Sequence, residues 1–238
     1  TEIDTLAVPV MVISRAEIER SLDGDLAALL TGLPGVEISR SGGAGQPASV
    51  FLRGAESDQT TVLVDGVRIN PGTIGGAQIQ NILTESIERI EIVKGARSSL
   101  YGTDAIGGVI NVITRAGATP GASLYASTGR YGTQVYAADA SGMLSERLGA
   151  GASLAYQRSD GFPPLQDSPA PGNYDNTSVN AQLRYAASDA LTLRAQLWQA
   201  SGLSAYAEFG APSQENFLDA SYATGAEWQG AGGARARV

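Results

Sequence analysis

The fold is decided by residues 90–115, which read IEIVKGARSSLYGTDAIGGVINVITR. The stretch begins with alternating apolar and charged residues up to Lys94-Gly95, and it closes with a β-rich run at Val109–Thr114. Between them stand a Tyr101-Gly102 step and the glycine-containing turn Ala105–Gly108. Glycine permits the positive φ angles of tight turns, and Val and Ile favour strands. The stretch therefore predicts two strands joined by a compact connection.

The chain before this stretch has the pattern of short helices and strands. Val8–Ile13 is β-rich but contains Pro9, which favours an edge strand. Ser14 followed by Glu17 fits a capping box at the start of a short helix. Asp65-Gly66, placed between two valines, predicts a two-residue hairpin turn. Residues 1–117 are therefore expected to form a compact α+β domain.

Residues 90–115 resemble the end of the plug domain of TonB-dependent outer-membrane receptors. Three further motifs stand upstream in that family's order: LPGV at 33–36, FLRG at 51–54 and VLVDGVRIN at 62–70. One departure is Ala96, where the family often has proline. The resemblance implies a plug domain at residues 1–117, followed at 118–238 by the first six or so strands of a transmembrane antiparallel β-barrel.

The second half of the chain alternates as barrel strands do. In Val179–Tyr185 and in Leu191–Leu197 the odd positions are apolar and the even positions carry Asn, Gln, Arg or Thr. Two connections are tight, and two, Ser159–Thr177 and Leu203–Leu218, are predicted to be long polar loops. Four aromatic residues near strand ends are expected to form an interfacial girdle: Tyr156, Tyr185, Trp198 and Trp228. A soluble β-sandwich also alternates in this way, so periodicity alone leaves it open.

Such a barrel needs about 22 strands to enclose a plug of this size. The chain is therefore expected to be a fragment of a multi-pass protein of the bacterial outer membrane, in contact with lipid or lipopolysaccharide. The TonB box, the segment on which TonB pulls in this family, is expected before Thr1. If the protein is exported, its signal peptide has been removed.

Composition excludes several functions. The chain has no cysteine and no histidine, which removes Ser-His-Asp catalysis and thiolate or imidazole metal sites. The formal net charge of −8 argues against nucleic acid as a partner. The resemblance implies a transport receptor, not an enzyme.

Within the family, the chain is most similar to cobalamin receptors. The resemblance implies uptake of cobalamin driven by TonB, with ferric siderophores as the alternative substrate and a soluble β-rich binding module as a second alternative. The family's apical loops place substrate binding at Gln46, Pro47, Ala48, Ser49, Pro71, Gly72, Thr73 and Ile74. No cofactor is required, although cobalamin receptors bind calcium through acidic loop residues. The matching candidates are Asp160, Asp167, Asp175, Glu208 and Asp219, and ordinary solvated acidic loops explain them equally well.

Overall fold

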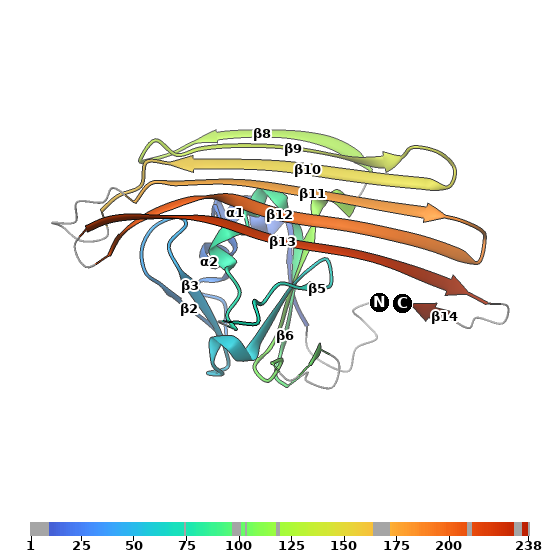
Figure 1. The fold of residues 1–238 in the computed structure, drawn as a ribbon, viewed down its shortest axis with the longest axis horizontal. Helices are drawn as coiled ribbons and strands as arrows, with labels where there is room; N and C mark the ends of the chain where they lie inside the picture. The colour runs from blue at the N-terminus through green and yellow to red at the C-terminus, as the bar shows by residue number, and fades with distance from the viewer. Residues whose placement is uncertain are drawn as a thin grey trace.

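The computed structural model describes residues 10–73, 75–96, 101–102, 104–117, 120–163, 172–208, 211–230 and 235–237. Figure 1 shows two parts: a small domain of short elements, and a long seven-stranded sheet that arches over it. None of the helices in the described ranges has the length and apolar character needed to cross a bilayer.

The small domain is built on a five-stranded sheet with the order β1-β6-β7-β4-β5. Its strands are β1 (Val10–Ser14), β4 (Thr60–Val64), β5 (Val67–Arg68), β6 (Ile87–Lys94) and β7 (Gly108–Thr114). The edge position predicted for the first strand is confirmed, as is the hairpin turn at Asp65-Gly66 between β4 and β5. The parallel pairing of β4 with β7 joins two segments that are far apart in the sequence.

Short helices and one hairpin complete this domain. The elements are α1 (Arg15–Ser21), α2 (Leu26–Leu30), β2 (Val36–Arg40), β3 (Ala48–Leu52) and the 3-10 turns η2 (Ser57–Gln59), η3 (Ile79–Asn81), η4 (Thr84–Ser86) and η5 (Arg115–Gly117). The predicted capping box is confirmed, because the Ser14 backbone N–H donates to Glu17 Oε2 at 2.8 Å. The core consists of fully buried aliphatic side chains such as Leu26, Leu52, Ile79 and Ile90.

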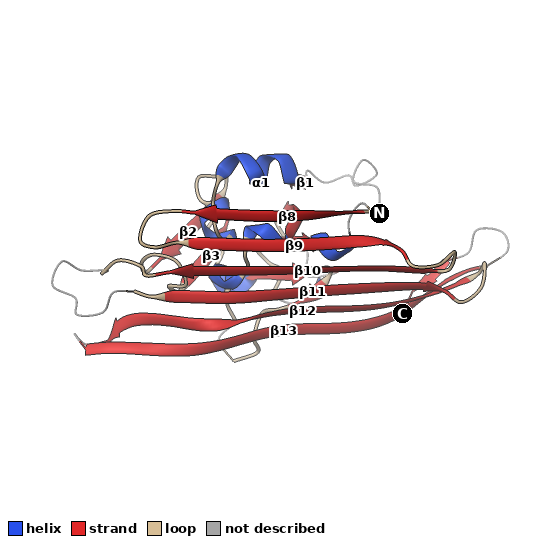
Figure 2. Ribbon diagram, turned by 90° about the horizontal axis from the view of Figure 1, so that it is seen from above, coloured by secondary structure: helices blue, strands red, loops and turns tan. Residues whose placement is uncertain are grey.

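The large sheet is a meander in the order β8 to β14. Its strands are β8 (Gly121–Thr128), β9 (Gln134–Met143), β10 (Leu148–Ser159), β11 (Tyr174–Ala186), β12 (Leu191–Glu208), β13 (Ala211–Gln229) and β14 (Arg235–Arg237). They run side by side as an open antiparallel sheet (Figure 2). The expected order of folds, a compact α+β domain followed by the strands of an antiparallel sheet, is confirmed.

Two predicted loops are wrong in extent. Leu203–Leu218 is not a long loop, because β12 and β13 pair from Leu191↔Trp228 as far as Glu208↔Ala211. The other loop is shorter than predicted, since β10 continues to Ser159 and β11 begins at Tyr174. The polar composition of these segments suggested loops. Their backbone N–H and C=O groups are nevertheless paired between strands, and this pairing does not depend on the polarity of the side chains.

The alternation predicted for the strands is confirmed for the described residues, with one exception among the aromatics. Leu154, Leu183 and Tyr222 are at least half exposed on the outer face, whereas Ser153 and Asn180 are buried against the small domain. Trp198 was expected in the outer girdle, but only 2% of it is exposed and it packs into the core of the small domain. Its even position places it on the inner face, opposite to Leu197.

Candidate functional site

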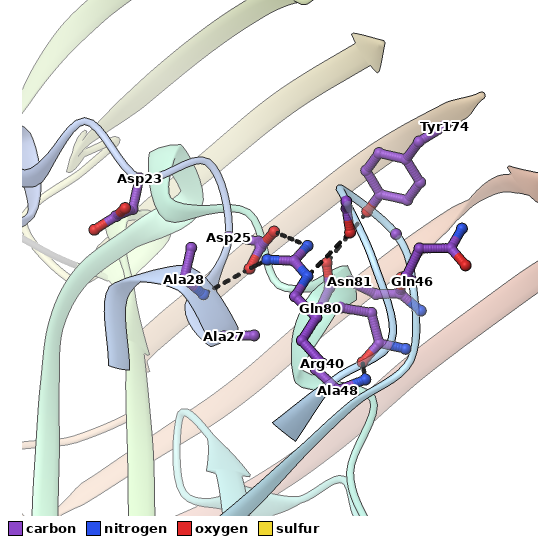
Figure 3. A network of polar contacts seen from close by, with 12 residues as sticks. Asp23, Asp25, Ala27, Ala28, Arg40, Gln46, Ala48, Gln80, Asn81 and Tyr174 are labelled. Carbon is purple, nitrogen blue, oxygen red and sulfur yellow. Dashed lines mark hydrogen bonds and ion pairs between the residues drawn. The ribbon is translucent and has the colours of Figure 1, made fainter. Parts of the chain in front are cut away.

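The loop joining β2 to β3, residues 41–47, is named the apical loop here. It is held from within the small domain by Arg40, whose Nη2 lies 2.7 Å from Asp25 Oδ2 and whose Nε donates to the Gly43 carbonyl oxygen at 3.0 Å. Asp25 is nearly buried and also caps α2, accepting from the Ala28 N–H at 2.9 Å. Figure 3 shows Arg40 between Asp25 and the loop that carries Gln46.

The other side of the apical loop is bonded to the large sheet. Gln46 Nε2 donates to the Ala205 carbonyl oxygen at 3.0 Å and to Ser204 Oγ at 3.3 Å. Ser204 Oγ in turn donates to the Gly45 carbonyl oxygen at 3.0 Å. Gly45 has φ +71°, and a Cβ there would overlap the ring of Tyr174. The large sheet, β8 to β14, is named the wall here. The apical loop can pack against this wall only with glycine at position 45.

A second segment, Gln78–Asn81, lies beside the apical loop and is named the floor segment. Gln80 Oε1 accepts from the Ala48 N–H at 3.4 Å, and the Gln80 carbonyl oxygen accepts from the Tyr174 hydroxyl at 3.3 Å. Asn81 Nδ2 donates to Asp219 Oδ2 at 2.8 Å. Asn176 Nδ2 donates to the Asn81 carbonyl oxygen at 2.8 Å. The floor segment is thus fixed to β11 and β13.

These segments enclose an open cavity of about 810 Å³, the apical cavity. Its volume is in the usual range for small-molecule sites. It is lined by Ser41, Gly45, Gln46, Pro47, Pro71, Gln78, Gln80, Asn81, Ser204, Tyr206, Glu215, Asn216, Phe217, Leu218 and Asp219. None of these described residues is Lys or Arg. The lining combines amides, two carboxylates and an aromatic surface, where Phe217 stacks on Tyr174 with ring centroids 6.1 Å apart.

The predicted substrate residues divide into three groups. Gln46, Pro47 and Pro71 line the apical cavity. Ala48 and Ser49 belong to β3 instead of a loop, and Gly72 and Thr73 lie in the turn after Pro71 without lining this cavity. Ile74 lies outside the described residues. Gln46, Pro47 and Pro71 thus lie in one site with residues of β12 and β13, a segment that was predicted to be a loop.

The predicted calcium ligands are not gathered into one cluster among the described residues. Asp160 pairs with Arg158 at 3.5 Å, and Asp219 accepts from Asn81. Asp175 and Asp219 were expected in loops but lie in strands β11 and β13. Asp167 and the side chain of Glu208 lie outside the described part of the chain. The calcium site stays a prediction.

Apart from Phe217, the residues that close the site on the side of the large sheet and of the floor segment have no signal in the sequence pattern that predicts them. Tyr174 sits at the first position of β11, where its hydroxyl accepts from Asn176 Nδ2 at 2.7 Å. Gln80 and Asn81 follow a glycine-rich loop with no recognisable pattern. The one available signal was Phe217, a large apolar residue within a polar stretch.

At the opposite end, Asp65 joins the small domain to the wall. Its carboxylate accepts from the Thr114 N–H at 2.9 Å and from Thr114 Oγ1 at 2.7 Å. Its carbonyl oxygen accepts from Gln196 Nε2 at 3.0 Å. Burial raises the pKa of Asp65, and the hydrogen bonds from Thr114 oppose that rise.

Comparisons with known proteins agree with this architecture. The family model of the TonB-dependent receptor plug domain matches residues 2–109. The vitamin B12 transporter BtuB of Vibrio vulnificus is 36% identical over 216 residues, covering 88% of this chain and 35% of that protein. The protein of the same name in Vibrio cholerae is 50% identical over 107 residues, covering 45% of this chain and 18% of its own length. The chain thus spans about a third or less of these relatives.

Solved structures share the fold. The siderophore receptor PirA from Acinetobacter baumannii superposes with a TM-score of 0.75 at 20% identity, covering 96% of this chain and 38% of its own. FpvA of P. aeruginosa, bound to a pyoverdine–iron complex, gives 0.78 at 15% identity, covering 96% and 32%. At these identities the likeness concerns the fold alone.

Proposed function

We propose that this chain, a member of the TonB-dependent receptor family, is part of an outer-membrane transporter that binds cobalamin and imports it with energy transmitted by TonB. The observation that carries the proposal is the likeness, at 36% identity over 216 residues, to a protein named a vitamin B12 transporter. In this proposal the protein transports its substrate and does not catalyse a reaction, and the small domain acts as a plug inside the barrel.

The apical cavity fits this substrate chemically. Cobalamin presents amide groups around an apolar ring system, and the lining offers matching amides from Gln46, Gln80 and Asn81. Glu215 and Asp219 add negative charge that no lining Lys or Arg offsets among the described residues. A ferric catecholate complex carries net negative charge and would be repelled. Cobalamin is therefore favoured over the siderophore alternative.

A binding titration tests the proposal. The full-length receptor, purified in detergent, is titrated with cyanocobalamin and, separately, with a ferric tricatecholate. We expect tight binding of cyanocobalamin and at least hundredfold weaker binding of the catecholate. Asp219→Asn, which removes one carboxylate and leaves the shape of the site intact, should weaken this discrimination. Tight catecholate binding without cobalamin binding would refute the proposal, and recovery without detergent would favour a soluble module.

We also propose that the full-length receptor binds TonB, the partner of this family. Calcium bound by the acidic residues predicted as its ligands, among them Asp160, Asp175 and Asp219, is a further part of the proposal. Calcium binding is tested by titrating the full-length receptor with Ca²⁺ alone and measuring the affinity for cyanocobalamin before and after chelation. An affinity that does not change on chelation would remove calcium from the proposal.

A further inference from the structure

A second cavity lies at the opposite end of the same two strands. It measures about 850 Å³ and is named the lower cavity. From the wall it is lined by Arg194 and Gln196 of β12 and by Ala223, Gly225 and Glu227 of β13. From the small domain it is lined by polar and charged side chains that include Asp65, Arg89, Glu91 and Asn111. Two large polar cavities therefore share one stretch of wall.

The strand register gives the separation of the two cavities. Ser204 and Glu215 are paired residues that line the apical cavity, and Gln196 and Ala223 are paired residues that line the lower cavity. Along β13 the two linings come within four residues, from Asp219 to Ala223. At a rise of about 3.3 Å per residue, this is about 13 Å. One layer of side chains therefore divides them.

That layer is centred on Trp198, which pairs with Ser221. Neither residue lines either cavity. Trp198 is 2% exposed and Ala200 is fully buried, and both belong to the apolar core of the small domain. Other inward side chains on this wall, such as Gln182 and Gln196, donate hydrogen bonds to the plug. Trp198 and Ala200 thus differ from these polar inward residues, because they belong to the apolar core of the plug, the small domain.

The indole of Trp198 is held there at a free-energy cost. Its Nε1–H is buried and has no hydrogen-bond partner among the described residues. Buried indole N–H groups are usually paired, and an exception calls for an explanation. A barrier that must separate from the small domain provides one, because an indole bonded to that domain would hold the two parts together more firmly.

We propose that substrate passes the plug along β12 and β13, from the apical cavity to the lower cavity, and that Trp198 is the barrier between them. The inference rests on the proposed transport function. The route then lies on one side of the plug, and substrate leaves through the lower cavity. The polar groups there, including the Arg194–Glu227 ion pair, suit a solute rich in amides.

A matched pair of substitutions tests the route in the full-length receptor. Ala223 lines the lower cavity, whereas Ala220 on the same strand is exposed on the outer face and lines neither cavity. With Ala223→Trp we expect cyanocobalamin binding within twofold of wild type and uptake into receptor-deficient cells reduced at least tenfold. With Ala220→Trp, the same substitution on the outer face, both should stay within twofold. Binding and uptake both near wild type in Ala223→Trp would overturn the route.

The barrier is tested separately and without substrate. Trp198→Ala should raise the ion conductance of the receptor in planar bilayers at least fivefold, whereas Trp228→Ala, which truncates an outer-face tryptophan, should leave it unchanged. Unchanged conductance in Trp198→Ala would overturn the barrier, and this measurement also decides the proposal if Ala223→Trp fails to reach the membrane. A wild-type receptor that does not bind or import cyanocobalamin would instead refute the proposed function, and the conductance arm would still hold.

Discussion

Arg40 joins the apical loop to the buried carboxylate of Asp25: one nitrogen of its guanidinium lies 2.7 Å from Asp25 Oδ2, and another donates to the Gly43 carbonyl oxygen. Arg40→Met would leave Asp25 buried without a cation. Losing one partner of a buried pair costs about 3–5 kcal/mol. Because the Arg40 side chain is 21% exposed, we expect a smaller loss of about 2–3 kcal/mol in unfolding free energy, with weaker cyanocobalamin binding.

The double variant Asp25→Asn/Arg40→Met is the control. It removes both charges, and asparagine can still accept from the Ala28 N–H, so most of the stability should return. Binding should stay weak, because the Gly43 carbonyl oxygen has lost its donor. Denaturant unfolding and titration measure the two effects, and a single variant as stable as wild type would contradict the role given to the pair.

Gly45→Ala should disturb the apical loop through the wall. The added methyl would overlap the Tyr174 ring, and alanine would be strained at φ +71°. Gly54 separates the two effects, because it has φ +76° with nothing within 4 Å of an added Cβ. We expect at least tenfold weaker cyanocobalamin binding for Gly45→Ala and less than twofold for Gly54→Ala, measured by titration. Equal losses would show that backbone strain alone is responsible.

The Asp65 carboxyl predicts a pH dependence. Burial raises its pKa above the ordinary 3.8, so the folded state holds this proton more firmly than the unfolded state. The contribution to stability is fully present below pH 3.8 and is lost as the pH rises through the raised value. Asp65→Asn, which tolerates the same positive φ, should flatten this dependence.

Hydrogen exchange measures this effect at β7, where the Thr114 N–H donates to Asp65. After correction for intrinsic rates, wild-type protection should decrease with rising pH above 3.8, and Asp65→Asn should show little change. The same slope in both proteins would mean that another group is responsible. Burial also raises the pKa of Glu85, so Glu85→Gln is the necessary comparison.

Gly151 of β10 lets the small domain approach the wall. A Cβ there would overlap the Ala116 carbonyl oxygen of η5. Because backbone cannot move aside as a flexible side chain can, we expect Gly151→Ala to lower the unfolding free energy by about 1–3 kcal/mol. Gly142→Ala, on the neighbouring strand, meets nothing within 4 Å and should change it by less than about 0.5 kcal/mol. Thermal unfolding in detergent compares the two, and similar midpoints would contradict this close contact.

Local chemistry in the sequence determined much of the fold. The Ser14 and Glu17 capping box and the Asp65-Gly66 turn involve groups within a few residues of each other, so their geometry follows from spacing alone. The parity of Leu191–Leu197 likewise fixed which face of β12 is apolar. Trp198 was predicted in the girdle because it is aromatic and near a strand end, and this was wrong: its even position in the same alternation lies on the buried inner face.

Only the tertiary structure decided the candidate site. Arg40 and Asp25 are 15 residues apart, and Gln46 and Ser204 are 158 apart, so no local spacing predicts either contact. The extent of β12 and β13 depends on pairing between strands, which satisfies backbone groups whatever the polarity of the side chains. The sequence by itself determined the plug and the alternation of the strands, because both are local. The position of the plug against its wall depends on contacts between distant segments, and these form only when the chain folds.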